Sequence, residues 1–105
     1  MFYEINQYRV IPGKMDAWLQ LMEEEFIPFA AEHGLNSVGS FRDAYDTTHT
    51  WIRRFDSEEE LERVHAAVYG SDFYKNEIEA RLPKLIMKGG YISQRIIPTP
   101  NSGLK

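Results

Sequence analysis

The sequence predicts an α+β domain of the ferredoxin-like type, with its elements in the order β-α-β-β-α-β. Three observations support this class. The chain has 105 residues, which is enough for one domain. Segments of strand-like composition alternate with segments whose apolar residues recur at three- and four-residue spacing. The two middle strands are joined by a turn short enough for a hairpin, so we expect an antiparallel sheet of order 4-1-3-2 with both helices crossing over one face.

The first strand and the first helix are recognised by their ends. Residues 2–11 mix aromatic, β-branched and polar side chains, and Pro12-Gly13 ends this strand because proline disfavours continued pairing. The helix that follows carries one apolar stripe, formed by Met15, Trp18, Leu19, Met22, Phe26 and Phe29. Pro28 lacks a backbone N–H, so we expect a kink or break one turn earlier. Gly34 suits the left-handed residue that commonly ends a helix.

A hairpin and a capped helix form the middle of the chain. Strands are predicted over residues 35–44 and 48–55. Ser57 and Glu60 then match a capping box, in which Ser57 accepts from the backbone of Glu60 and the Glu60 side chain reaches back to Ser57. We expect a helix from there to Gly70.

The last part of the chain contains a broken helix and a final strand. After Gly70-Ser71 a further helical segment is predicted up to Arg81, and the last strand over residues 91–97 follows Gly89-Gly90. The main domain therefore spans residues 1–97. Residues 98–105 form an extended tail, which we expect to lie along a partner subunit near the mouth of a cavity.

Composition excludes several classes of function. With 43% hydrophobic residues the chain is globular, and its apolar runs are too short to span a membrane. The net charge of −4 disfavours nucleic acids and anionic membranes as partners. The absence of cysteine excludes disulfides and thiol catalysis. We see no metal-ligand spacing, no nucleotide fingerprint and no targeting segment, so we expect no metal or other cofactor and take the cytoplasm as the default location.

Alternation along the strands separates two sets of side chains. One set is mostly short and aliphatic, and we expect it to pack under the helices: Tyr3, Ile5, Ile52, Ile92, Gln94 and Ile96. The other set combines large aromatic and polar groups: Glu4, Asn6, Tyr8, Val10, His49, Trp51, Arg53, Phe55, Tyr91, Ser93, Arg95 and Ile97. On the open face of a monomer this second set would form an apolar patch, so we expect a homodimer whose sheets pack face to face around a cavity.

The aromatic and polar set supplies the candidate site for a small molecule. His49 and Glu4 are the candidate catalytic residues, because each can carry a proton near neutral pH in a suitable environment. The candidate ligand-binding residues are Asn6, Tyr8, Trp51, Arg53, Tyr91 and Arg95. In this scheme the arginines hold a carboxylate or phenolate, Asn6 or Tyr8 stabilises an enolate oxygen, and the aromatic side chains form the walls. The alternative is that these residues form a satisfied polar core of the dimer interface.

Four segments in order resemble the NIPSNAP family. They are the opening strand with its Pro12-Gly13-Lys14 turn, the helix end from Phe26-Ile27-Pro28 to His33-Gly34, the run Trp51-Ile52-Arg53-Arg54-Phe55-Asp56-Ser57, and Leu82-Pro83-Lys84-Leu85. The family belongs to the dimeric α+β barrel superfamily, so the resemblance implies the predicted topology and a dimer. Three residues depart from its pattern: Asn6 and Leu61 stand where arginine is usual, and Tyr74 replaces a common tryptophan.

The resemblance leaves the activity open. Our first hypothesis is a protein that binds a small aromatic or polyketide-like molecule in the barrel cavity, with the chemistry of a cofactor-independent monooxygenase or isomerase that abstracts a proton beside a carbonyl. The alternative is a non-catalytic homo-oligomeric assembly or ligand-sensing module. A third hypothesis is haem binding or haem degradation, because Asn6, Trp51 and His65 are similar in residue type to the Asn/Trp/His set of haem-degrading relatives.

Overall fold

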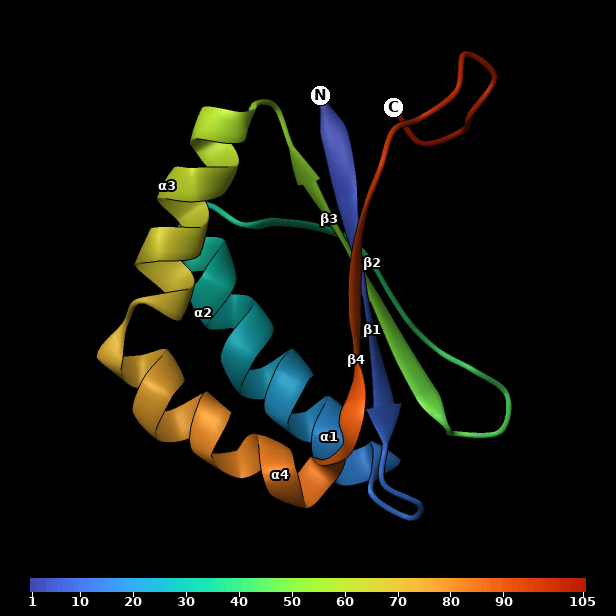
Figure 1. Cartoon of the computed structure of the whole chain (residues 1–105), viewed down its shortest axis with the longest axis vertical. Helices are drawn as coiled ribbons and strands as arrows, with labels where there is room; N and C mark the ends of the chain where they lie inside the picture. Colours follow the sequence, from blue (N-terminus) through green and yellow to red (C-terminus); the bar gives the residue numbers. More distant parts are fainter.

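The computed structural model describes residues 1–105 as a four-stranded antiparallel sheet with helices on one face (Figure 1). The elements are β1 (Phe2–Val10), α1 (Met15–Leu21), η1 (Met22–Phe26), α2 (Ile27–Glu32), β2 (Asn36–Arg42), β3 (Thr48–Phe55), α3 (Glu58–Tyr69), η2 (Tyr74–Ile78), η3 (Glu79–Arg81), α4 (Leu82–Leu85) and β4 (Ile86–Ile96). The strand order is β2-β3-β1-β4. This is the predicted order counted from the opposite edge, so the predicted fold class is confirmed.

The first helix is continuous but contains one wide turn. Between α1 and α2 the backbone forms the π-helical turn η1, and the N–H of Ile27 donates to the carbonyl of Met22, five residues earlier. Pro28 follows directly and has no N–H to donate. The irregularity thus falls where the sequence predicts it, one turn before the proline. At the far end Gly34 adopts a φ of 93°, which only glycine occupies without strain.

The second helical region consists of α3 and a bent arm. Ser57 accepts from the backbone of Glu60 at 3.1 Å, as predicted, but the Glu60 carboxylate accepts from the backbone of Asp56 rather than that of Ser57. Beyond Gly70 the arm is formed by η2, η3 and α4. The last strand begins at Ile86, five residues before the predicted start, because Ile86 still pairs with Val10 of β1, and residues 87–90 form an irregularity between this pair and the pair of Tyr91 with Tyr8.

The two faces of the sheet are the reverse of the prediction. Glu4 is paired across the strands with Arg53 and Arg95, and Tyr8 with His49 and Tyr91, so these residues share one face. That face lies against the helices. The space between a sheet and a helix layer is filled by large side chains, and the aromatic set buries more apolar area there than isoleucines would.

The outer face carries the short aliphatic set instead. Ile5, Ile52 and Ile96 are half-buried and Ile92 is 60% exposed, so no other element of the chain covers the centre of this face. The tail folds back over one end of it. Pro98, Thr99, Ser102 and Leu104 line a shallow groove there with Tyr3, which is buried. No helix in the structure has both the length and the apolar character that a membrane crossing requires.

Candidate ligand-binding cavity

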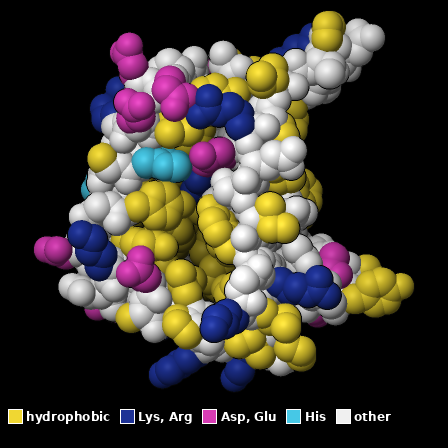
Figure 2. Space-filling view, in the orientation of Figure 1, with side chains coloured by type: hydrophobic (Ala, Val, Ile, Leu, Met, Phe, Trp, Pro, Cys, Tyr) yellow, Lys and Arg dark blue, Asp and Glu magenta, His cyan; other side chains and the backbone are white.

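The structure contains a cavity of about 430 Å³ between the sheet and the helices. It is open beside β4, and Figure 2 shows it as a recess with mostly hydrophobic walls. Its lining comprises nine hydrophobic and two polar residues: Tyr8, Trp18, Phe26, Arg53, His65, Tyr69, Tyr74, Ile78, Leu82, Ile86 and Tyr91. Such a volume suits a small organic molecule, and the lining fits the usual pattern of an apolar pocket with a few polar groups.

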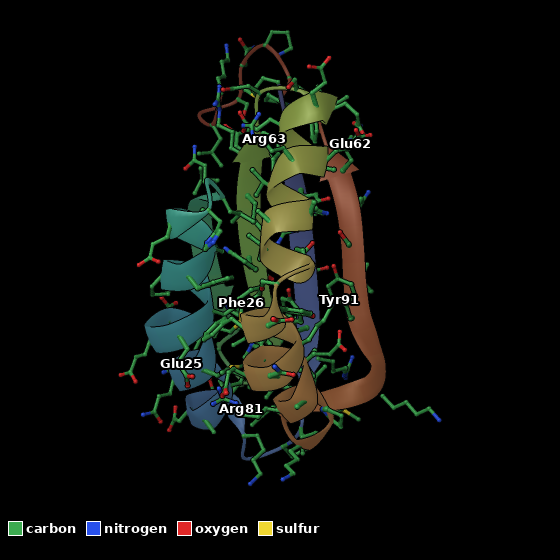
Figure 3. The ribbon with its side chains drawn as sticks, turned by 90° about the vertical axis from the view of Figure 1, so that its left-hand side faces the viewer. Glu25, Phe26, Glu62, Arg63, Arg81 and Tyr91 are labelled. Carbon is green, nitrogen blue, oxygen red and sulfur yellow. The ribbon has the colours of Figure 1, made fainter.

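Aromatic rings form most of the wall. Tyr8 contacts Trp18 with ring centroids 5.0 Å apart and Tyr91 at 5.2 Å. On the helical side Tyr74 contacts Phe26 at 5.4 Å and Tyr69 at 4.9 Å, edge to face. Figure 3 shows Phe26 and Tyr91 on opposite sides of the helical arm. These tilted and edge-on contacts hold the rings of the cavity wall in place.

One end of the cavity is polar and is organised by Arg53. Its guanidinium is 1% exposed, donates to the Tyr69 hydroxyl and the Glu4 carboxylate, and lies 4.6 Å from the centre of the Trp51 ring. Its Nε–H has no acceptor in the protein. An unpaired buried donor of this kind costs about 1–3 kcal/mol.

Glu4 and Arg53 are both charged. Burial alone raises the pKa of Glu4, but the hydrogen bond from His65 and the charge of Arg53 outweigh it and lower the pKa to about 2. Burial also opposes the charge of Arg53, yet the neighbouring Tyr69, Tyr8 and Glu4 keep its pKa above the ordinary range for arginine. A carboxylate with so low a pKa is a weak base, so the predicted role of Glu4 as a proton acceptor gains no support. Its geometry fits the positioning of Arg53 and His65.

The phenols around the cavity are neutral donors. Burial raises the pKa values of Tyr8 and Tyr69, and it raises that of Tyr74 to about 12. Since the Tyr69 oxygen accepts from Arg53, its own proton remains available to a bound molecule.

His49 lies outside the cavity lining and is part of a hydrogen-bonded chain. The Trp18 indole N–H can only donate, so Nδ1 of His49 accepts from it at 3.0 Å. Nε2 then carries the proton and donates to the Ser40 hydroxyl at 2.8 Å, and Ser40 donates to the carboxylate of Glu23 at 2.9 Å. Burial lowers the pKa of His49 to about 4, opposed by the charge of Glu23. Both ring nitrogens are occupied, so His49 connects the first helix to the sheet rather than facing a ligand.

The structure separates the remaining predicted residues. Tyr8, Arg53 and Tyr91 line the cavity as expected. The other three predicted ligand-binding residues do not: Asn6 is buried between Tyr8 and Ser93, Trp51 donates to Ser37 beneath Arg53, and Arg95 pairs with Glu58 at 2.7 Å over the ring of Phe2.

Residues of the helical layer complete the site and were not among the predicted ligand-binding residues. Trp18 and Phe26 come from the first helix, and His65, Tyr69 and Tyr74 come from α3 and the arm. One sequence signal points to His65 and Tyr69. They alternate with Val64 and Val68 at the spacing of a buried helical face, which indicates that both side chains face the sheet.

The residues present do not fit a haem group. Nε2 of His65, the atom that would meet the iron, lies 3.3 Å from the Glu4 carboxylate and 3.4 Å from Nη2 of Arg53. Asn6 and Trp51 are fully buried and hydrogen-bonded within the protein. The cavity therefore gives no support to haem binding or haem degradation by this protein. No group of three or more His, Asp or Glu side chains is placed to bind a metal ion.

The fold and the cavity define a ferredoxin-like α+β protein with a pocket between its sheet and its helices. The NIPSNAP family model matches residues 3–88, and the chain belongs to this family, which confirms the resemblance seen in the sequence. No curated protein matches the chain.

Solved structures of similar proteins support the fold. The protein Atu4242 from Agrobacterium tumefaciens is 24% identical, with a TM-score of 0.87 over 100% of both chains. A NIPSNAP domain protein from Burkholderia xenovorans is 13% identical, with a TM-score of 0.83 over 97% of this chain and 98% of its own. An antibiotic biosynthesis monooxygenase is 16% identical, with a TM-score of 0.68 over 95% of this chain and 100% of its own. At these identities the comparison establishes the fold alone.

Proposed function

We propose that the protein binds a small aromatic or polyketide-like molecule in the cavity between its sheet and its helices. The observation that carries the proposal is the composition of the cavity: nine hydrophobic residues, most of them aromatic, surround a space of about 430 Å³ that ends at a buried, charged Arg53. The apolar wall supplies affinity for a ring system, and the single polar end fixes its orientation.

The chemistry that this site suits is proton abstraction beside a carbonyl, as in a cofactor-independent monooxygenase or isomerase. The neutral Tyr69 hydroxyl and the charged Arg53 are donors for an oxygen that gains negative charge. The similarity in fold to an antibiotic biosynthesis monooxygenase agrees with this reaction class.

Native mass spectrometry on protein purified from its own host tests the proposal. We expect a small organic molecule that stays bound under native conditions and is released on denaturation. A variant with the cavity filled, Leu82→Trp, should lose that molecule, whereas Leu61→Trp should keep it, because Leu61 is half-buried but does not line the cavity. Equal retention by both variants would contradict the proposed binding place.

A second candidate function, a non-catalytic homo-oligomeric assembly, is favoured by the outer face of the sheet. Its centre presents Ile92, which is 60% exposed, beside the half-buried Ile5, and an exposed apolar face is typical of an interface. We therefore propose a homodimer that packs through this outer face and leaves the cavity of each chain intact.

Sedimentation velocity tests the dimer at micromolar concentration. Ile92→Glu should shift the protein to monomer, because it would bury an unpaired charge in the interface. Ala67→Glu, on the exposed side of α3, should remain dimeric. A monomeric wild-type protein would contradict the proposal.

A further inference from the structure

The polar end of the cavity suggests the chemical class of the ligand and the fate of its proton. We propose, resting on the proposed function above, that the ligand carries an acidic phenol or enol group and is bound as its anion, with the oxygen held by the Tyr69 hydroxyl beside the charge of Arg53 and the proton accepted by His65.

The arrangement of donors favours a single anionic oxygen. Nη1 of Arg53 donates to Tyr69 and Nη2 to Glu4, so the two-pronged side of the guanidinium is not free to hold a carboxylate in the usual paired geometry. The Tyr69 hydroxyl lines the cavity, and because its oxygen accepts from Arg53, its own O–H remains free to donate to a ligand. A single donor backed by the charge of Arg53 matches one oxygen of a phenolate or enolate better than the two oxygens of a carboxylate.

His65 is placed to accept the proton. It lines the cavity from α3, and its side chain is 32% exposed. Its Nε2 lies 3.3 Å from the carboxylate of Glu4, which offsets the positive charge that His65 gains when it takes a proton. Glu4 does not line the cavity, so it acts as a positioning residue behind His65.

The charges balance before and after the transfer. The charged or titratable groups that face His65 are Glu4 from β1, Arg53 from β3 and Tyr69 from its own helix. With a neutral ligand the site holds one anion, Glu4, and one cation, Arg53. When the ligand O–H bond breaks and an N–H bond forms at His65, the new cation lies beside Glu4 and the new anion beside Arg53 and Tyr69. The step needs no oxidant or cofactor.

The surrounding wall fits the same class. Tyr8, Trp18 and Phe26 offer aromatic surfaces beyond the polar end, which suits a ring attached directly to the acidic oxygen. A flexible aliphatic acid would use neither the ring surfaces nor the single-oxygen donor.

The test uses 4-nitrophenol, whose anion is coloured, and 4-nitroanisole, which has the same ring but no acidic proton. We expect both to bind, and the pKa of bound 4-nitrophenol to fall by about one pH unit or more, which corresponds to about tenfold tighter binding of the anion than of the neutral phenol. The shift should shrink in Tyr69→Phe and in His65→Gln. Tyr45→Phe and His33→Gln change exposed residues outside the cavity and should keep it.

The outcomes separate the two proposals. If both probes bind but the pKa of the phenol is unchanged, the proposed cavity function stands and the ionising site is refuted. If the shift persists in both Tyr69→Phe and His65→Gln, these residues do not form the site. If neither probe binds, the aromatic ligand class itself is refuted.

Discussion

Replacing Glu4 by glutamine tests the ion pair on which the cavity depends. The pKa of Glu4 falls from its ordinary value of 4.5 to about 2 in the folded protein. At about 1.4 kcal/mol for each pH unit, the ionised carboxylate stabilises the fold by about 3 kcal/mol at neutral pH. Because the folded pKa is the lower one, this stability is complete above pH 4.5 and is lost as the pH falls through 2.

The measurement is urea denaturation of the wild type and Glu4→Gln from pH 7 to pH 2, followed by tryptophan fluorescence. The variant should be less stable by about 3 kcal/mol at pH 7, about 1.4 kcal/mol at pH 3 and under about 1 kcal/mol at pH 2. His49 also gains a proton in this range, but it does so in both proteins, so its effect cancels in the difference. Glu24→Gln, on the exposed side of the first helix, is the control and should follow the wild type. A difference that stays constant with pH would show that the charge of Glu4 does not support Arg53.

Three further predictions concern stability and are checked by the same denaturation assay. Ser57→Ala removes the cap on the backbone N–H of Glu60 and should cost about 1 kcal/mol, whereas Ser57→Asp should cost much less. Gly34→Ala forces a side chain into a φ of 93° and should cost about 1 kcal/mol or more, and an unchanged midpoint would contradict the assigned backbone conformation. His49→Phe leaves the buried indole N–H of Trp18 without an acceptor and should cost about 1–3 kcal/mol while ligand affinity changes little, because His49 does not line the cavity.

Most of the fold follows from local signals in the sequence. Pro12-Gly13, the hairpin turn and the Ser57 cap each act within a few residues, so they locate the element boundaries well. The start of β4 at Ile86 is different, since it depends on pairing with Val10, which is 76 positions away. The residues around Ile86 therefore do not indicate that the strand already begins there.

The site was only partly predictable, because it too depends on contacts between residues that are far apart in the sequence. Alternation separates Glu4, Arg53 and Tyr91 from the isoleucines, but it does not state which set faces the helices. The sequence predicts the aromatic set on the outer face because short aliphatic side chains suit packing under helices. Burying the polar groups of the aromatic set is expensive unless they find partners. In the structure Arg53 and His49 avoid that cost through partners on other elements, Tyr69 and Trp18 among them. Such partners become visible only when the helices and the sheet are brought together.

The position of β4 makes the cavity wall depend on two strands that are far apart in the sequence. Tyr8 belongs to the first strand and Tyr91 to the last, and the two rings meet in the cavity wall. On a ribosome, the N-terminal strand must therefore wait for the C-terminal strand before this wall exists. Ile86 and Tyr91 of β4 both line the cavity, so the cavity exists only where β4 is paired with β1.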